Sequence, residues 1–178
     1  MKVIDLTNFL EARFKAKDVE LKVCNLAIQS IPFGDNYFDI VIFTEVFEHL
    51  LPPTETILRE VSRVLHPEGR LIFSTPNFAR LQNRIKLLVG ISPIEPVDQQ
   101  FKKGWVHGNG HVREYTMKEI LQILSGNNFM IYKNMFIAPP PSVRSIKSAY
   151  SLAELIYRIV GLLIPAFKPT IYIEGQKS

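Results

Sequence analysis

The alternation of apolar and polar positions is clearest between residues 33 and 77. Residues 38–43 (FDIVIF) predict a strand, residues 54–65 (TETILREVSRVL) an amphipathic helix, and residues 70–74 (RLIFS) another strand after a turn at Gly69. A strand, a helix and a strand in this order form a crossover between two parallel strands. The sequence therefore predicts an α/β fold with a mainly parallel sheet.

The segments on either side of this unit continue the same kind of pattern. Further strands are expected at residues 1–6, 18–25, 129–137 and 170–174, the last one antiparallel to its neighbours. Further helices are expected at residues 8–15, 80–89 and 117–124, and a capping box of Thr116 and Glu119 starts the last of these. Residues 91–110 are rich in proline and glycine and predict an irregular segment, which is a lid, a binding loop or disordered.

A long apolar segment, residues 152–167 (LAELIYRIVGLLIPAF), has the spacing of a helix with one apolar stripe. Glu154, Arg158 and Pro165 interrupt it, and it is too short to span a bilayer comfortably. We expect a helix packed on the core. A peripheral membrane contact and a partner-binding helix are the alternatives.

Composition narrows the class of protein. Of the 178 residues 47% are hydrophobic and 21% charged, which is typical of an ordered globular domain. The net charge is +4, but the cations are scattered along the chain, so no nucleic-acid partner is indicated. The single cysteine, Cys24, excludes an internal disulfide and cannot anchor a zinc site. Because the chain opens with no leader pattern, we expect a cytoplasmic location.

The unit at residues 32–77 closely resembles the middle of the class I S-adenosylmethionine (SAM)-dependent methyltransferases with type 11 or type 23 domains. That family carries a "PF…FDxVxxxxVxEHL" segment followed by "RVLxPGGxLxxSTPN". The matching residues are Pro32-Phe33, Phe38-Asp39, Val41, Glu45, Glu48-His49-Leu50, Arg63-Val64-Leu65, Pro67, Gly69 and Thr75-Pro76-Asn77. A later family pattern, "HxREYTxxEL", is matched by residues 111–120 (HVREYTMKEI).

This resemblance implies a Rossmann-like α/β fold, a mainly parallel sheet with helices on both faces, as an N-terminally truncated class I fold. We divide a single domain, residues 1–178, into a cofactor-side core (1–77), a substrate and lid region (78–115) and C-terminal helices and strands (116–178). The implied function is methyl transfer from SAM to a small-molecule or glycan-like acceptor. The alternative is a non-catalytic, truncated methyltransferase fold that serves as a binding or dimerisation module.

The resemblance also assigns residues to the cofactor. Asp5 ends a strand where the family holds the ribose hydroxyls of SAM, although an aspartate there also caps a helix. Asn25 stands where the family accepts the adenine amino group, with Leu26 or Ala27 as the backbone donor; a turn-forming asparagine is the alternative. Thr44 and Glu45 lie where the loop passes the methionine arm.

The acceptor side follows from the same comparison. His49 is the candidate general base, with capping or packing within its loop as the alternative. The acceptor pocket is expected to be lined by Asn77, Trp105, His111, Arg113 and Tyr115. No metal is expected, because only His107 and His111 are close in sequence and no cysteine or acidic pattern completes a site.

One family feature is absent from these 178 residues. The pattern "VLDxGxGxG", a central strand with a Gly-rich turn, has no counterpart, and the spacing makes residues 1–6 the family's second strand. In an alternative alignment, residues 1–6 are the first strand with the turn deleted. Since unpaired edges are unfavourable, we expect residues 3–6 to shift beside residues 41–43 or a second copy to form a homodimer there, unless the sequence starts within its gene. Weak or absent SAM binding is the functional consequence.

Overall fold

The computed structural model describes residues 2–5, 15, 17, 19–50, 54–94, 96, 111–138 and 159–178. Its strands are β1 (Lys2–Asp5), β2 (Glu20–Val23), β3 (Phe38–Thr44), β4 (Leu65–Pro76), β5 (Phe129–Ile137) and β6 (Thr170–Lys177). Its helices are α2 (Thr54–Val64), α3 (Leu81–Leu88) and α5 (Met117–Ser125), with the 3-10 turns η1 (Phe47–His49) and η3 (Pro165–Phe167). The expected helix at residues 8–15 falls almost entirely outside these residues.

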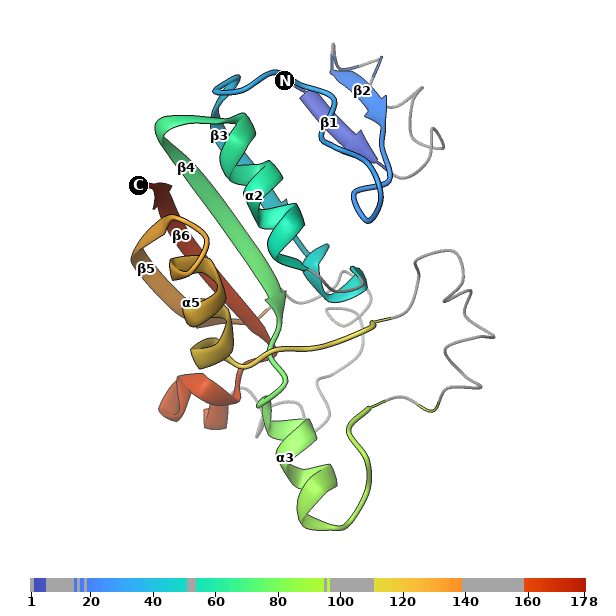
Figure 1. The fold of residues 1–178 in the computed structure, drawn as a ribbon. Helices are drawn as coiled ribbons and strands as arrows, with labels where there is room; N and C mark the ends of the chain where they lie inside the picture. The colour runs from blue at the N-terminus through green and yellow to red at the C-terminus, as the bar shows by residue number, and fades with distance from the viewer. Residues whose placement is uncertain are drawn as a thin grey trace.

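Four strands form the main sheet, in the order β3-β4-β6-β5 (Figure 1). β3 and β4 are parallel and are joined through α2, as the strand–helix–strand pattern predicted. β6 lies antiparallel between β4 and β5, which confirms the direction expected for the end of the chain. The predicted α/β fold is therefore present.

The strands β1 and β2 form a separate, parallel two-stranded sheet on the β3 side of the main sheet (Figure 1). All four residues of β1 pair with β2, and an ion pair between Lys2 and Glu20 adds to this pairing. Within the described residues β1 does not pair with β3, so the expected shift of residues 3–6 beside residues 41–43 is wrong. The pairing of β1 with β2 instead fits its interpretation as the family's second strand.

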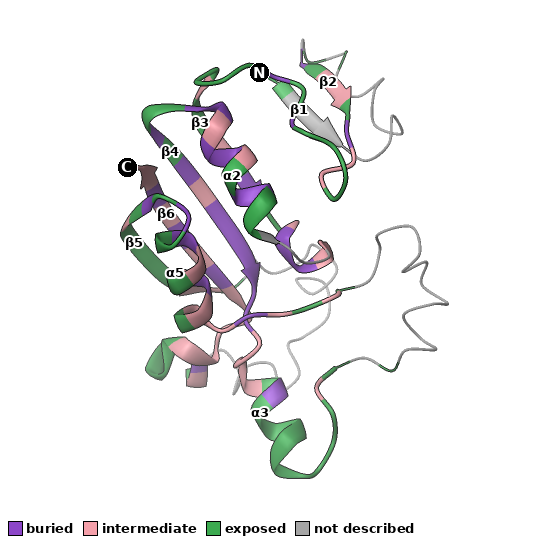
Figure 2. Ribbon diagram, in the orientation of Figure 1, coloured by how far each residue is buried: buried purple, intermediate pink, exposed green. Residues whose placement is uncertain are grey.

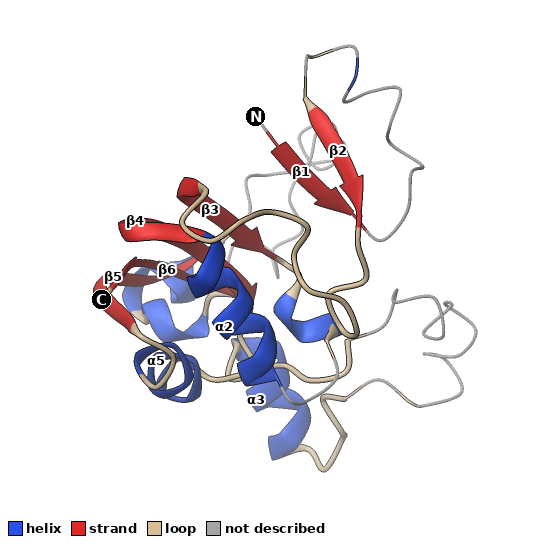
Figure 3. Ribbon diagram, turned by 45° about the horizontal axis from the view of Figure 1, so that its top comes forward, coloured by secondary structure: helices blue, strands red, loops and turns tan. Residues whose placement is uncertain are grey.

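The hydrophobic core lies between one face of the main sheet and the helices α2 and α5 (Figure 3). Buried residues come from every layer: Phe43, Leu71, Phe73, Ile171 and Ile173 from the strands, Leu58 and Val61 from α2, and Ile120 and Leu124 from α5. The capping box of Thr116 and Glu119 starts α5 as predicted. In Figure 2 the buried residues, in purple, lie along β4 and on parts of α2.

The opposite face of the main sheet carries exposed apolar residues in the part of the chain that the structure describes. They are Ile40 and Ile42 of β3 and Met130, Tyr132 and Met135 of β5. The helix expected at residues 8–15 lies almost entirely outside the described residues, and residues 152–158 of the helix expected at 152–167 lie outside them as well.

The strand β4 is longer than the sequence pattern indicated. Leu65 pairs with Phe38 and Arg70 pairs with Ile40, so residues 66–69 bulge out where a turn was predicted. A side chain at Gly69 would place its Cβ 2.7 Å from the carbonyl oxygen of His66, which explains the glycine. The bulge lets the chain leave α2 and enter β4 without a separate loop.

The described part of the apolar segment is a short helix at residues 159–163, followed by η3. Leu162 and Leu163 are 75% and 76% exposed, so the expected core packing does not extend to them. None of the helices that the structure describes combines the length and the apolar character needed to cross a membrane.

Candidate functional site

The candidate site lies at the carboxyl ends of β3 and β4, where open α/β sheets bind their ligands. Glu45 follows β3 with a positive φ of 54°, a conformation uncommon for a residue other than glycine. Two contacts to Ser74 of β4 hold it: the Glu45 amide donates to the Ser74 carbonyl at 3.0 Å, and the Ser74 hydroxyl donates to Glu45 Oε1 at 2.7 Å. The loop after β3 is thus anchored to the neighbouring strand.

Glu48, on the 3-10 turn that follows, is a buried carboxylate with only 1% of its surface exposed. Thr75 Oγ1 donates to its Oε2 at 3.0 Å, whereas its Oε1 has no hydrogen-bond partner. Burial raises the pKa of Glu48, and the nearby charge of Glu45 adds to this shift. A buried polar atom without a partner is rare in folded proteins and calls for an explanation.

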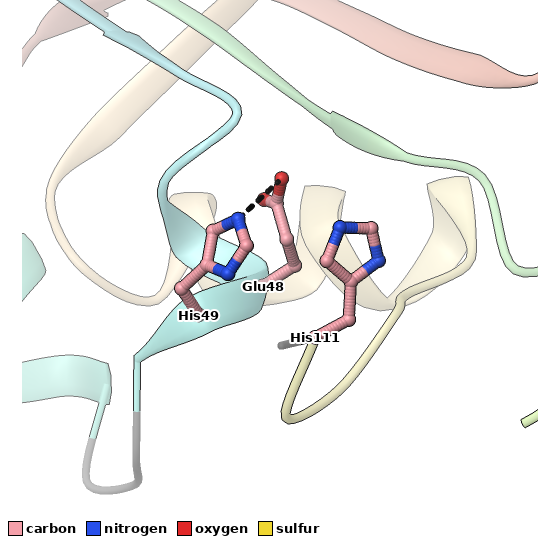
Figure 4. Close-up of side chains that lie close together, drawn as sticks. All are labelled: Glu48, His49 and His111. Atoms are coloured by element: carbon pink, nitrogen blue, oxygen red, sulfur yellow. Dashed lines mark ion pairs between the residues drawn. The ribbon is translucent and has the colours of Figure 1, made fainter. Parts of the chain in front are cut away.

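Two histidines lie beside this carboxylate (Figure 4). His49 Nε2 is 3.8 Å from Glu48 Oε1, and the His49 and His111 rings meet edge to face with their centroids 4.9 Å apart. The amides of Val112 and Arg113 donate to the Glu48 carbonyl at 2.7 and 3.2 Å. These backbone bonds hold the segment that carries His111 against the turn that carries Glu48.

A second carboxylate, Glu114, holds the His111 ring from its other side. His111 Nδ1 is 3.1 Å from Glu114 Oε1, and Arg80 Nη1 is 2.5 Å from Glu114 Oε2. The hydrogen bond to Glu114 raises the pKa of His111. Although burial opposes it, the hydrogen bonds from His111 and Arg80 lower the pKa of Glu114. The chain from Arg80 through Glu114 to His111 fixes the orientation of this imidazole.

Among the residues expected to line the acceptor pocket, Asn77 and Tyr115 are buried and already engaged. The Asn77 amide donates to the carbonyls of Ala166 and Lys168, both at 2.9 Å, and its Oδ1 accepts from the Ala79 amide at 3.0 Å. The Tyr115 ring packs on Phe47 with a centroid distance of 5.1 Å. Both side chains are used in contacts within the protein. Their role toward an acceptor stays a prediction.

The two remaining acceptor-side candidates differ. Arg113 is exposed, donates to Glu119 at 2.7 Å and lies over the Tyr115 ring. Trp105 lies outside the described residues.

The candidates for the cofactor lie on both sheets. Asp5 ends β1 opposite Val23, and Asn25 follows β2, so both stand at the same end of the two-stranded sheet. Asn25 Oδ1 accepts from the Ala27 amide at 3.0 Å, and Leu26 lies within the same turn. Thr44 is the last residue of β3 and is exposed. The Asn25 contact is that of a turn-forming asparagine, which sequence alone left as an alternative.

Sequence reasoning did not single out Glu114, Arg80 and Thr75, which hold the two ends of the His111–Glu48 pair. Glu114 carries a sequence signal, since it lies three residues after His111 within the matched segment HVREYT. Thr75 belongs to the matched Thr75-Pro76-Asn77 motif, but no role was assigned to it. Arg80 carries no such signal, because only the folded chain brings it to the site.

Comparison with known proteins shows which sequences and folds the chain resembles. Residues 4–73 match a family model described as a methyltransferase domain. The chain is 39% identical over 56 residues to the sarcosine/dimethylglycine N-methyltransferase of Halorhodospira halochloris, a match that covers 32% of this chain and 20% of that protein. The chain spans less than half the length of the curated relatives it matches.

Solved structures resemble the chain over almost its full length. A SAM-dependent methyltransferase from Thermotoga maritima is similar with a TM-score of 0.64 and 15% identity, covering 99% of this chain and 72% of that one. The 1,6-didemethyltoxoflavin-N1-methyltransferase of Burkholderia thailandensis, solved with its substrate and S-adenosylhomocysteine, gives 0.59 and 16%, covering 99% and 60%. Residues 4–73 thus match a methyltransferase domain, and the chain has the fold of the class I SAM-dependent methyltransferases.

Proposed function

We propose that the chain is a methyltransferase that transfers the methyl group of SAM to an oxygen or nitrogen of a small-molecule or glycan-like acceptor. The observation that carries this proposal is the methyltransferase-domain match together with the strained Glu45 at the carboxyl edge of β3. The Burkholderia neighbour was solved with a small-molecule substrate, which supports an acceptor of that kind.

The residues at the ends of β1 and β2 would hold the adenosine part of SAM. The carboxylate of Asp5 suits the two ribose hydroxyls. Asn25 with the backbone of Leu26 or Ala27 would meet the adenine edge, with contacts to the ligand replacing the bond between the Ala27 amide and Asn25 Oδ1. Thr44 and Glu45 would border the methionine arm. When bound, SAM would supply an activated methyl group on a positively charged sulfur.

The residues around η1 would serve the acceptor. Transfer requires the acceptor atom, the methyl carbon and the sulfur to lie in line, so positioning is the main task of the protein. In this proposal Asn77, Trp105, His111, Arg113 and Tyr115 surround the acceptor. His49 takes the proton that the acceptor loses as the new bond to the methyl carbon forms and the carbon–sulfur bond breaks.

We expect the 178-residue chain to bind SAM with a Kd at or above about 100 µM, a binding free energy of no more than roughly −5.5 kcal/mol. The adenosine contacts are few, and the sequence contains no Gly-rich turn whose backbone would receive the amino-acid end of the ligand. Titration calorimetry with SAM and S-adenosylhomocysteine measures this. Asn25→Ala should weaken the binding further, while Ile85→Ala on the exposed side of α3 should not. Micromolar affinity would contradict the prediction and indicate a replacement for the missing turn.

A second candidate function, a dimerising module, is favoured by the edge of β3. Among the described residues β3 pairs only with β4, and Ile40 and Ile42 next to its open edge are 52% and 66% exposed. An open edge with apolar side chains is a template for pairing with another strand. A second copy of the chain would supply that strand.

We expect light scattering to give twice the 20.4 kDa mass of one chain at micromolar concentrations. Ile42→Lys should weaken the dimer at least about tenfold, since it places a charge where an apolar residue would be buried. Leu88→Lys, an equally drastic change at an exposed position of α3, should leave the mass unchanged. A monomer at every concentration tested would exclude this module.

A further inference from the structure

We propose that Glu48, His49 and His111 form a binding site for a divalent transition-metal ion of the zinc type. Their ligand atoms all lie within 4.8 Å of one another. The proposal goes beyond methyl transfer and does not depend on it. It also replaces the expectation that this chain binds no metal, which considered only His107 and His111 as neighbours in sequence.

The unpartnered oxygen of Glu48 is the first argument. Glu48 is 1% exposed, and its Oε1 is buried without a hydrogen-bond partner on the same side as His49. A buried carboxylate oxygen without a partner is unfavourable, and a cation bound to it removes that penalty. Figure 4 shows this carboxylate beside both imidazole rings.

The second argument is the set of hydrogen bonds behind the ligands. A histidine that binds a metal commonly donates its other ring N–H to a carboxylate, which fixes the tautomer and the ring orientation. His111 Nδ1 has this partner in Glu114 at 3.1 Å, and Arg80 in turn holds Glu114. The ring nitrogen that faces Glu48 in Figure 4 is therefore Nε2, which carries the lone pair when the neutral ring donates Nδ1–H to Glu114. The second oxygen of Glu48 is held in the same way by Thr75 Oγ1 at 3.0 Å.

The donor atoms determine the class of ion. Two imidazoles and one carboxylate suit Zn²⁺ and similar transition metals, whereas Mg²⁺ and Ca²⁺ prefer oxygen ligands. Three protein ligands leave a fourth position open, as in zinc sites that bind a substrate or water. At this edge of the sheet that position would suit an acceptor oxygen, a consequence that rests on the proposed function. His49 could then not serve as general base with the same nitrogen.

The geometry requires only a small closure. Ligands of a tetrahedral zinc ion lie about 3.3–3.5 Å apart, given bond lengths of about 2.0–2.2 Å. Glu48 Oε1 and His49 Nε2 are 3.8 Å apart and all three ligand atoms lie within 4.8 Å of one another, so each pair has to close by about 1.5 Å or less. The backbone bonds between Glu48 and residues 112 and 113 hold the segment of His111 close enough for such a shift.

The test is a titration of the metal-free 178-residue chain with Co²⁺, whose visible absorption reports ligand number and donor type. We expect one Co²⁺ to bind per chain, with the visible absorption of a four-coordinate ion. Added Zn²⁺ should displace the Co²⁺ and remove this absorption. His111→Ala should weaken binding at least about tenfold, and Glu114→Gln, which removes the negative charge behind His111, about tenfold. His66→Ala, at the amino end of β4, should bind like the wild type.

Circular dichroism of each variant separates loss of the site from loss of the fold. His111 is on the surface, so His111→Ala is expected to keep the wild-type spectrum. Absence of saturable binding in the wild type, unchanged binding in His111→Ala, or an equal loss in His66→Ala would overturn the proposal. Because SAM and acceptor are absent from the titration, its failure leaves the proposed methyltransferase function untouched.

Discussion

Replacing Phe73 by alanine is expected to lower the free energy of unfolding by about 3–5 kcal/mol. Phe73 is fully buried in β4, and its ring packs against Phe47 and Phe43 at centroid distances of 5.5 and 6.0 Å. The truncation removes a large apolar surface and leaves a cavity that these rings cannot fill without moving. A urea titration followed by circular dichroism measures the loss.

The matched control is Tyr132→Ala on the open face of β5, where the ring is half exposed. It should change the free energy of unfolding by about 1 kcal/mol or less. Equal effects of the two substitutions would mean that the core is not centred on β4. The effect of Phe73 also reaches the site, because Ser74 and Thr75, which follow it, hold Glu45 and Glu48.

The elements that sequence predicted well are those whose signal is local. The period of β3 and α2, the βαβ order and the capping box of Thr116 and Glu119 each depend on residues a few positions apart. β6 followed from an alternating segment at the end of the chain. Such patterns depend only on which side chains of a segment are buried and which are exposed. The elements they predict are therefore found in the folded molecule.

The features that sequence missed depend on partners far along the chain. The bulge at residues 66–69 arises from the pairing of Leu65 with Phe38, and nothing in the local pattern shows that pairing. The approach of His111 to Glu48 depends on two backbone amides that donate to the Glu48 carbonyl. His111 was therefore weighed with His107, its neighbour in sequence, instead of with the carboxylate it meets in space.

The assignment of β1 shows a different limit. Sequence spacing indicated that the central strand is absent and that the sheet has a free edge, and β1 and β3 are indeed unpaired with each other among the described residues. Sequence could not decide which segment pairs with which strand edge, because that depends on the relative free energies of the alternative strand pairings. All four residues of β1 pair with β2, and among the described residues the edge of β3 opposite β4 is unpaired.

Replacing Arg63 by alanine is expected to lower the free energy of unfolding by about 2–3 kcal/mol. The guanidinium on α2 donates to the carbonyls of Ile31 and Phe33, both at 3.0 Å, and to Asp35 and Glu60 at 2.8 Å. Its loss leaves two carbonyls without their donor and two carboxylates without their cation. The segment after β2 would then lose its main attachment to α2.

Two variants sharpen this prediction. Arg63→Lys keeps the charge but not the planar fork of donors, so it should restore less than half of the loss. Arg59→Ala, an exposed arginine one turn earlier on the same helix, should change stability by about 0.5 kcal/mol or less. If Arg59→Ala and Arg63→Ala have equal effects, the network around Arg63 does not stabilise the fold.

The same network predicts how this difference depends on pH. The hydrogen bond from Arg63 lowers the pKa of Glu60 below its ordinary value of 4.5. A carboxyl group whose pKa is lower in the folded state stabilises the protein above the unfolded pKa and loses that contribution as pH falls through the folded pKa. The difference in free energy of unfolding between wild type and Arg63→Ala should therefore be full at neutral pH and shrink below about pH 4.

Hydrogen exchange at the Ile31 amide, which donates to Glu60 Oε2 at 2.9 Å, should be faster in Arg63→Ala at neutral pH. An unchanged exchange rate there would show that the segment after β2 is held by other contacts.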